Sequence, residues 1–230
     1  MKGILLVDKP VGWTSFDVVG YVRKIIATEQ KIKPAQIKVG HAGTLDPLAS
    51  GLLLLLIGKE YTKKAGDFSK LDKKYLVDIK LGETTESGDR ETEPKFYSDY
   101  KPTRQEVDQS LKTFEGKSMQ MPPIYSALKV NGQRAYKMAR QGKTIELKAR
   151  PVNIYNLELL KYDYPVLKLD TRVSSGTYIR SLVFDLGNSL KSGAYMTDLK
   201  RTVIGDFKLE DAVNVEKLDH DQIEAHLIFV

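Results

Sequence analysis

The segment from Gly40 to Gly51, GHAGTLDPLASG, places the carboxylate of Asp46 among glycines and directly before the apolar run from Leu52 to Ile57. Glycines let a backbone approach a ligand closely, and a buried strand downstream would hold the loop still. A carboxylate in this setting is a candidate nucleophile. The other interpretation of Asp46-Pro47 is an N-cap followed by the first residue of a short helix.

The same stretch, extended to GHAGTLDPLASGLLLLLIGKE, resembles the catalytic segment of pseudouridine synthases of the TruB type, which isomerise uridine 55 in the T-loop of tRNA. Five further segments match that family in the same order. They are GILLVDKPVGWTSFDVV (3 to 19), DKKYLVDIKLGETTESGD (72 to 89), MPPIYSALKVNGQRAYKMARQG (121 to 142), SSGTYIRSLVFDLG (174 to 187) and DLKRTVIGDFKLEDAV (198 to 213). Six segments in register over nearly the whole chain make the resemblance specific.

The resemblance implies that Asp46 and Arg180 are catalytic. Asp46 could attack C1′ of the ribose, add to C6 of uracil or stabilise an elimination to a glycal, and the sequence does not choose among these routes. In the family the arginine that matches Arg180 pairs with this aspartate. The residues point the same way, because Thr177 is a candidate N-cap of a helix that runs to about Leu186 and stops at Gly187. Arg180 then falls in the first turn, where the helix dipole disfavours a cation unless a carboxylate is near. An exposed arginine is the alternative.

Four more residues match family positions that handle the flipped uridine. The resemblance implies that His41 fills the space that the base leaves. Tyr75 would stack on the uracil, and its hydroxyl would act in proton transfer, so it is a catalytic candidate as well. Tyr178 and Leu199 would line the uracil pocket. From the residues alone, His41 and Leu199 fit ordinary structural roles, and Tyr75 fits an inward-facing strand position. Asp89 matches a second acidic position and is expected to have a supporting role.

Basic residues gather between Lys129 and Arg150, where seven stand against one acidic residue, Glu146, while the rest of the chain carries 29 of each sign. Basic side chains interleaved with an aromatic, Tyr136, suit a phosphate backbone and unstacked bases. In the family the matching segment, about 124 to 150, is a mobile thumb that closes on the RNA stem-loop. A solvated basic surface is the alternative for this segment. Lys9-Pro10 could contact a phosphate or position the catalytic loop, and a simple turn is the structural alternative there. The residues expected to contact the RNA backbone are Lys9, Lys129, Arg134, Lys137, Arg140 and Lys143.

Composition narrows the class of protein. The 230 residues include no cysteine, which excludes disulfides and thiolate metal sites, and only three histidines. We expect no metal and no cofactor, since the isomerisation involves no net redox change. The longest apolar run, Leu52 to Ile57, is too short to span a bilayer and no signal peptide is evident, so a soluble, cytoplasmic protein is expected. No surplus amphipathic segment is evident, which predicts a monomer without an obligate protein partner.

Hydrophobic patterning predicts an α+β fold. Thr14 with Asp17, and Thr103 with Glu106, are capping-box patterns that open helices. Alternation predicts strands with one buried row each, and the rows are Tyr75, Val77, Ile79 and Leu81, and Leu167, Leu169, Thr171 and Val173. The family fold is a mixed, largely antiparallel sheet with packed helices and a central catalytic cleft. We expect a catalytic domain over 1–213 and a short tail over 214–230, without the PUA domain that many family members carry.

Two other functions stay open. The chain could be a non-catalytic module of the same fold that binds RNA and helps tRNA to fold by opening and reclosing the T-arm. It could also be a relative of dyskerin that depends on a guide RNA, although that class normally needs a PUA domain and partner proteins. Replacement of Asp46 separates the first from an enzyme, and turnover of a bare T-arm stem-loop excludes the second.

Overall fold

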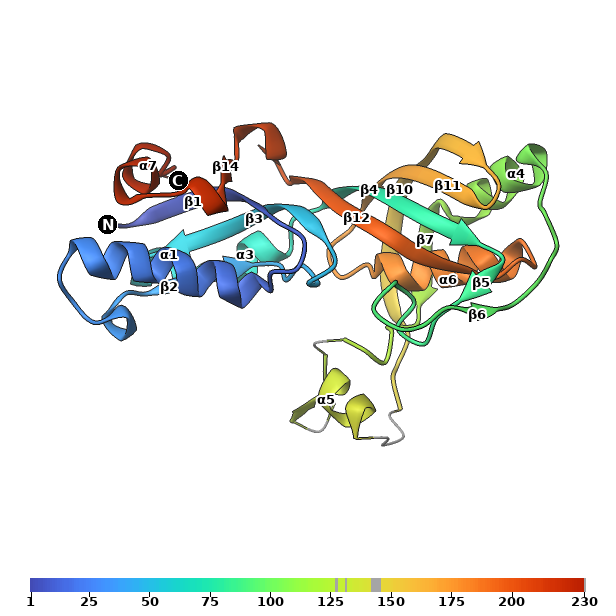
Figure 1. Ribbon diagram of the computed structural model, residues 1–230, viewed down its shortest axis with the longest axis horizontal. Coiled ribbons are helices and arrows are strands. Elements are labelled where there is room, and N and C mark those ends of the chain that lie inside the picture. Colours follow the sequence, from blue (N-terminus) through green and yellow to red (C-terminus); the bar gives the residue numbers. More distant parts are fainter. Residues whose placement is uncertain (127, 131, 142–145, 230) are drawn as a thin grey trace. The chain divides into compact units, whose positions relative to one another are not determined.

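The computed structural model describes residues 1–126, 128–130, 132–141 and 146–229 (Figure 1). The chain forms two compact units, one of Met1–Tyr75 with Leu199–Val230 and one of Leu76–Asp198. Strands β4 (Lys73–Leu81) and β12 (Ala194–Ile204) each contribute residues to both units. Because the chain leaves the first unit and returns to it, residues far apart in the sequence build that unit.

The strands of the first unit follow the order β14-β1-β3-β12, with β2 also paired to β3 and β13 to β12. Three pairs, β1 with β3, β2 with β3 and β12 with β13, are antiparallel, and the pairs β1 with β14 and β3 with β12 are parallel. The sheet is therefore mixed, as predicted. The further bounds are β1 (Gly3–Lys9), β2 (Val39–Ala42), β3 (Ser50–Ile57), β13 (Phe207–Lys208) and β14 (Val213–Asn214).

Helices cover both faces of this sheet. Leu5, Leu53 and Leu55 pack with apolar residues of α1 (Ser15–Glu29) and α7 (His220–Ala225). Leu54 and Leu56 point the other way and pack with residues of α2 (Lys59–Lys63) and α3 (Ala65–Ser69). A strand buried on both faces needs apolar residues at every position, which explains why β1 and β3 read as continuous apolar runs.

The second unit is built on strands in the order β12-β4-β11-β10-β7, and the β10 pairs with β11 and β7 are antiparallel. Both predicted buried rows are confirmed, since alternate residues of β4 from Lys73 to Leu81 and of β11 from Leu167 to Val173 are buried. Helix α4 packs against β10 and α6. The bounds are β5 (Glu83–Thr84), β6 (Lys95–Phe96), α4 (Arg104–Phe114), β7 (Gly116–Gln120), β8 (Lys129–Val130), β9 (Gln133–Arg134), α5 (Ala135–Arg140), β10 (Arg150–Asp163), β11 (Val166–Val173) and α6 (Ile179–Ser189).

Both predicted capping boxes are confirmed. The Thr14 hydroxyl accepts from the Asp17 N–H at 3.1 Å, and the Asp17 carboxylate accepts from the Thr14 N–H at 2.8 Å. Thr103 and Glu106 make the same reciprocal pair at the start of α4. Each box supplies partners for backbone donors that a helix start leaves open, so the sequence defines these two starts locally.

The predicted ends of α6 were wrong. The N-cap is Tyr178 rather than Thr177, whose hydroxyl donates to the Ser174 carbonyl at 2.9 Å. The helix continues through Gly187 to Ser189. A Cβ at position 187 would lie 2.4 Å from the backbone nitrogen of Ala194, so Gly187 permits a close approach of two backbones instead of ending the helix.

Residues 209–229 add three short helical elements and a strand to the first unit. Val215, Leu218 and Ile223 are buried in its core, β14 pairs with β1, and Ile228 bridges to Ile4. The helical segments there are η2 (Leu209–Asp211), η3 (Val215–Lys217) and α7, and η1 (Pro34–Gln36) follows α1. The segment treated as a tail in the sequence analysis therefore closes part of the core. None of the helices in the described ranges is long and apolar enough to cross a membrane.

Candidate active site

The loop that carries Asp46, residues 40–51 and hereafter the Asp46 loop, is fixed by contacts from two directions. The Ser15 hydroxyl accepts from the Leu45 N–H at 2.9 Å and donates to the Leu45 carbonyl at 3.1 Å. The Gly12 N–H donates to the Pro47 carbonyl at 2.7 Å. Residues 46–49 form one isolated turn, with Ala49 N–H bonded to the Asp46 carbonyl at 3.1 Å, so Asp46 does not cap a helix. The Asp46 side chain is partly exposed on this anchored loop.

Arg201 on β12 ties the Asp46 loop to the sheet, and the sequence analysis did not select it. Its side chain is 1% exposed. Its Nε donates to the Leu52 carbonyl at 2.8 Å and its Nη2 to the Gly43 carbonyl at 3.0 Å. Burial lowers the pKa of Arg201, while a hydrogen bond to the Tyr75 side chain and the charge of Asp46 raise it. One buried guanidinium therefore links Asp46 and Tyr75, two of the three predicted catalytic residues.

A signal for Arg201 was present in the sequence. Leu199 and Arg201 are two residues apart in a strand, so both side chains lie on one face. Leu199 is 6% exposed, and an arginine on a buried face is a cation that needs partners. The burial of Leu199 fits the core role, and its predicted place in a uracil pocket stays a prediction.

Lys9 adds a second buried cation below the Asp46 loop. Its Nζ donates to the carbonyls of Pro10 and Trp13 at 2.8 and 2.7 Å, and the side chain is fully buried. Burial lowers the pKa of Lys9 to about 8, and the charge of Asp46 acts in the opposite direction. A buried ammonium cannot contact an RNA phosphate, so this corrects the predicted backbone contact. The other interpretation, a residue that positions the catalytic loop, agrees with these bonds.

His41 lies on β2, at the start of the Asp46 loop, and its ring meets the ring of Phe16 edge to face with centroids 5.5 Å apart. Burial lowers the pKa of His41, and the charge of Arg201 lowers it further. Its Nδ1 is buried without a hydrogen-bond partner among the described residues. At neutral pH the ring is therefore uncharged, which suits a side chain that replaces a base in a stack.

Arg180 lies in the second unit, in the first turn of α6, and is buried there. Its Nε lies 3.5 Å from a carboxylate oxygen of Asp89, which is 1% exposed. Its other nitrogens donate to the Ser87 carbonyl at 3.0 Å and to the Tyr125 carbonyl at 2.8 Å. Asp89 thus supplies the carboxylate that a cation at a helix start requires, and the alternative of an exposed arginine is wrong. Asp46 belongs to the first unit, so its pairing with Arg180 stays a prediction.

Tyr178, the N-cap of α6, is held by its backbone. Its N–H donates to Gln120 Oε1 at 2.8 Å, and its carbonyl accepts from Gln120 Nε2 at 3.1 Å. Gln120 ends β7 and is buried, so one amide side chain fixes the start of the helix against that strand. The sequence carries no local signal for this contact, because the partners are 58 residues apart.

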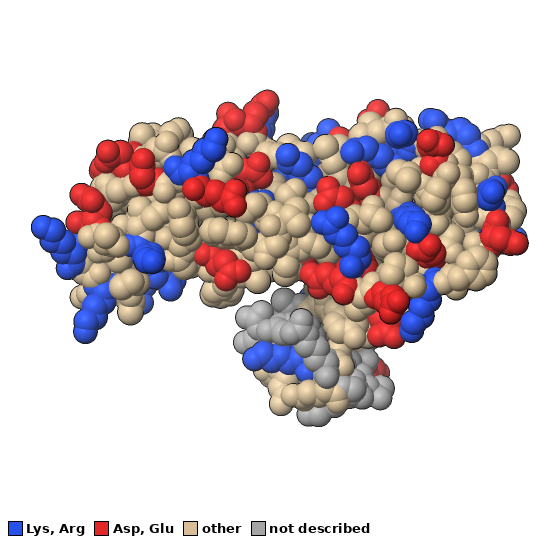
Figure 2. Space-filling model, viewed as in Figure 1, with Lys and Arg blue, Asp and Glu red and all other residues tan. Residues whose placement is uncertain are grey.

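The predicted RNA contacts between residues 129 and 143 are described only in part. Lys129 and Arg134 pair across the β8-β9 hairpin, which leads into α5 with Lys137 and Arg140. Lys137 is exposed, and Lys143 lies outside the described residues. On the face in view in Figure 2, basic and acidic side chains are interspersed over both units, in agreement with their balance outside the basic segment. These contacts stay predictions.

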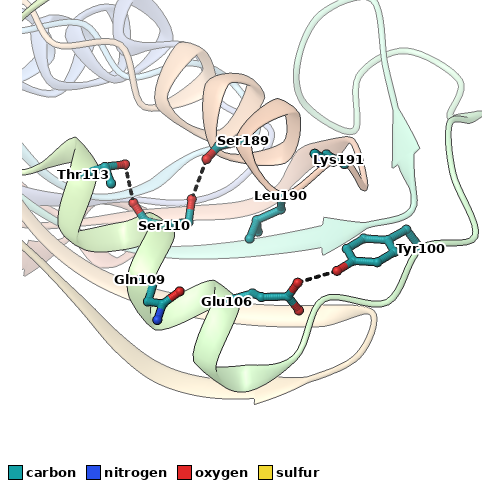
Figure 3. A pocket seen from close by; sticks show the side chains of 8 residues that line it. All are labelled: Tyr100, Glu106, Gln109, Ser110, Thr113, Ser189, Leu190 and Lys191. Atoms are coloured by element: carbon teal, nitrogen blue, oxygen red, sulfur yellow. Dashed lines mark hydrogen bonds between the residues drawn. The ribbon is translucent and has the colours of Figure 1, made fainter.

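A pocket of about 330 Å³ lies between α4 and the end of α6 (Figure 3). Its carboxylate, that of Glu106, accepts hydrogen bonds from the Thr103 backbone and the Tyr100 hydroxyl. The Ser110 and Ser189 hydroxyls bond to each other at 2.8 Å. Polar groups that satisfy one another hold two helices together, and no predicted site residue lines this pocket. The described residues also contain no group of three metal-ligating side chains.

Comparison with known proteins identifies the family to which the chain belongs. A family model described as TruB family pseudouridylate synthase, N-terminal domain, matches residues 26–179, and one described as tRNA pseudouridylate synthase B C-terminal domain matches residues 180–226. The chain belongs to the TruB family. Over 226 residues it is 45% identical to a tRNA pseudouridine synthase B of Parabacteroides distasonis, covering 98% of this chain and 94% of that protein. It is 44% identical to the protein of the same name from Clostridium novyi over 230 residues, covering 100% of this chain and 76% of the relative.

The fold of the family is present as well. The structure of a Cbf5-Nop10-Gar1 complex contains a chain that is 29% identical, with a TM-score of 0.71 over 97% of this chain and 57% of that chain. A second similar chain, 27% identical, comes from an H/ACA RNP bound to a substrate RNA containing 2′-deoxyuridine, with a TM-score of 0.67 over 94% of this chain and 52% of that one. The predicted α+β pseudouridine synthase fold is confirmed.

Proposed function

We propose that this protein isomerises the uridine at position 55 in the T-loop of tRNA to pseudouridine. The observation that carries the proposal is the Asp46 loop, whose backbone is anchored and whose partly exposed carboxylate interacts electrostatically with two buried cations, in a chain of the TruB family. The sequence motif supplied the residue, and the hydrogen bonds that hold the backbone on both sides of Asp46 support its use as a positioned nucleophile.

The reaction breaks the bond between N1 of uracil and C1′ of the ribose, turns the base and joins C5 to C1′. No electrons are gained or lost overall, and one carboxylate can promote the cleavage by attack at C1′, by addition at C6 or by stabilising an elimination. Asp46 has this role in the proposal. Arg201 and Lys9 are positioning residues, because their hydrogen bonds go to backbone carbonyls.

Access to the base requires that the uridine leave the stack of the T-loop. We assign the vacated place to His41, whose neutral ring lies at the start of the same loop. The side chain of Tyr75 and the charge of Asp46 both raise the pKa of Arg201, which supports a role for the Tyr75 hydroxyl in moving the proton from C5. Arg180, Tyr178 and Leu199 complete the proposed site on the strength of the motifs, and the basic segment contacts the stem.

The deciding experiment is incubation of the purified chain with an unmodified T-arm transcript, without added metal or cofactor, followed by mapping of pseudouridine at nucleotide resolution. We expect one modified site at the T-loop uridine and a loss of at least about 1000-fold in rate for Asp46→Asn with RNA binding retained. Asp67→Asn, at an exposed aspartate of α3, is the matched control and should leave the rate unchanged.

Each alternative function has its own result in this assay. Binding without modification by the wild-type chain would favour a non-catalytic RNA-binding module. Modification that appears only when a second RNA is added would favour guide-dependent action. Turnover of the bare stem-loop excludes both.

A further inference from the structure

An open groove of about 570 Å³ runs along the start of α1, and the proposed function does not use it. Its walls are aromatic, with Trp13, Phe16 and Tyr21 along one side of the helix, and Lys24 lies at its end. Gly12 and Gly20 also line the groove. A Cβ added at either glycine would meet no atom within 4 Å, so the space beside both is open to a ligand.

Phe16 is the unusual residue of the groove, because 68% of it is exposed although it is a large apolar side chain. The Thr14–Asp17 capping box fixes the helix turn that carries it. Trp13 and Tyr21 meet edge to face with centroids 5.5 Å apart and pack on the core below. The exposed ring is therefore carried by a capped helix turn beside packed neighbours. Stacking a base on such a ring costs little conformational entropy of the protein.

The groove is continuous with the Asp46 loop. The ring of Phe16 contacts that of His41 at an interplanar angle of 89°. Gly12 bonds to the Pro47 carbonyl, next to Asp46. A ligand in the groove would thus neighbour His41 and the Asp46 loop, which the proposed function places at the target uridine.

Charges of both signs border the groove, because Asp17 and Lys24 both line it. The hydrogen bonds from Thr14 lower the pKa of Asp17 and keep it ionised, so the attraction for an anionic ligand must come from the lysines. Beyond Lys24, three exposed lysines, Lys31, Lys33 and Lys38, follow the end of α1, with Glu29 among them. Phosphate groups on a chain that leaves the groove in this direction would meet a basic surface.

We propose that this groove binds an unstacked nucleotide of the RNA substrate that neighbours the target uridine, with its base against Phe16 and its phosphate near Lys24. Base stacking on an aromatic ring is tolerant of base identity and depends on the ring's planar face. The inference rests on the proposed function for the identity of the RNA, and its test is independent of turnover.

The test uses Asp46→Asn protein, so that RNA stays unmodified, and T-arm stem-loops that carry the fluorescent base 2-aminopurine at each unpaired loop position in turn. We expect one position to be quenched on binding. Adding Phe16→Ala should remove that quenching and weaken binding by about tenfold, while Phe16→Tyr should restore both. Phe229→Ala, at a ring of the first unit that is 67% exposed, is the matched control and should change neither signal.

Lys24→Gln should weaken binding and reduce its salt dependence by about one phosphate contact, whereas Lys63→Gln, at an exposed lysine of α2, should not. Quenching that persists in Phe16→Ala, or an affinity loss no larger than that of Phe229→Ala, would overturn the proposal. If wild-type protein binds the stem-loop without modifying it, the proposed function fails, and the quenching still decides whether the groove holds a nucleotide.

Discussion

Arg201 in the first unit and Arg180 in the second are both buried, and each holds loop backbone to a neighbouring element. Arg201 donates to the carbonyls of Gly43 and Leu52, and Arg180 donates to those of Ser87 and Tyr125. The carboxylates differ. Nε of Arg180 lies 3.5 Å from a carboxylate oxygen of Asp89, which is itself buried. The carboxylate that acts on Arg201 is that of Asp46, whose charge raises the pKa of Arg201 and which is partly exposed.

The difference distinguishes a carboxylate that stabilises the fold from one that a substrate can reach. Asp89 accepts further bonds from the Ser87 hydroxyl at 2.5 Å and the Glu91 N–H at 3.0 Å, so its oxygens are engaged within the unit. A carboxylate buried among donors stabilises a fold but does not reach a substrate. A partly exposed carboxylate on an anchored loop keeps its access to a substrate. The second arrangement is the one that a nucleophile needs.

The largest effect in this comparison is expected for Arg201→Met. It removes donors from two carbonyls and from the Tyr75 contact, and should lower the free energy of unfolding by about 3–5 kcal/mol. Arg201→Lys should keep part of the stability and still lose activity, because an ammonium cannot reproduce the fork of the guanidinium. Urea unfolding and the rate on the T-arm transcript measure the two effects. Arg90→Met, at an exposed position, is the control, and an equal loss there would contradict the special role of Arg201.

A double-mutant cycle tests the Arg180–Asp89 pair. Arg180→Gln leaves the Asp89 carboxylate buried beside a neutral amide, and each single variant should cost about 2–4 kcal/mol of unfolding free energy. The double variant with Asp89→Asn should cost less than the two losses added together, by about 1 kcal/mol or more. Strict additivity in urea unfolding would show that the pair does not act as a unit.

Gly187→Ala examines the packing of the helix that carries Arg180. The new Cβ would lie 2.4 Å from the Ala194 nitrogen, so helix and strand must separate, at a cost of about 1–3 kcal/mol. Gly66→Ala in α3 is the matched control, because a Cβ there meets nothing within 4 Å, and it should be neutral or slightly stabilising. Equal melting temperatures of the two variants would refute the steric account.

The smallest effect concerns the pH dependence of stability near Arg201. Lys9 and Lys73 both have a pKa of about 8, below the ordinary 10.5, because burial disfavours the charged ammonium. Between these values the unfolded chain binds more protons than the folded chain, so the free energy of unfolding rises with pH in this window. Lys9→Met should reduce that rise by about 1 kcal/mol per pH unit. Urea titrations between pH 8 and 10.5 compare it with Lys63→Met, and an unchanged slope would contradict the burial of a neutral Lys9.

Much of this protein could be predicted where the cause is local. The capping boxes at Thr14 and Thr103 lie within four residues, and the alternation in β4 and β11 follows from a two-residue period, so the sequence carried both signals. The constrained loop that carries Asp46 was also predictable, because a glycine-rich motif precedes an apolar strand there, whereas the catalytic role of Asp46 stays a prediction. Where local rules were applied to the start and end of α6, at Thr177 and Gly187, they failed.

The failures share a cause, which is that contacts distant in sequence overruled local preference. Gln120 holds the start of α6 from 58 residues away, and Gly187 lets the backbone of β12 at Ala194 approach the helix closely. The sequence by itself determined the residue types, the helix starts with reciprocal caps and the strands with buried rows. Only the tertiary structure decided that Arg201 reaches Gly43 across 158 residues and that Lys9 lies too deep to contact RNA. A buried charge is stable only where its partners converge on it, and that convergence is a property of the folded chain.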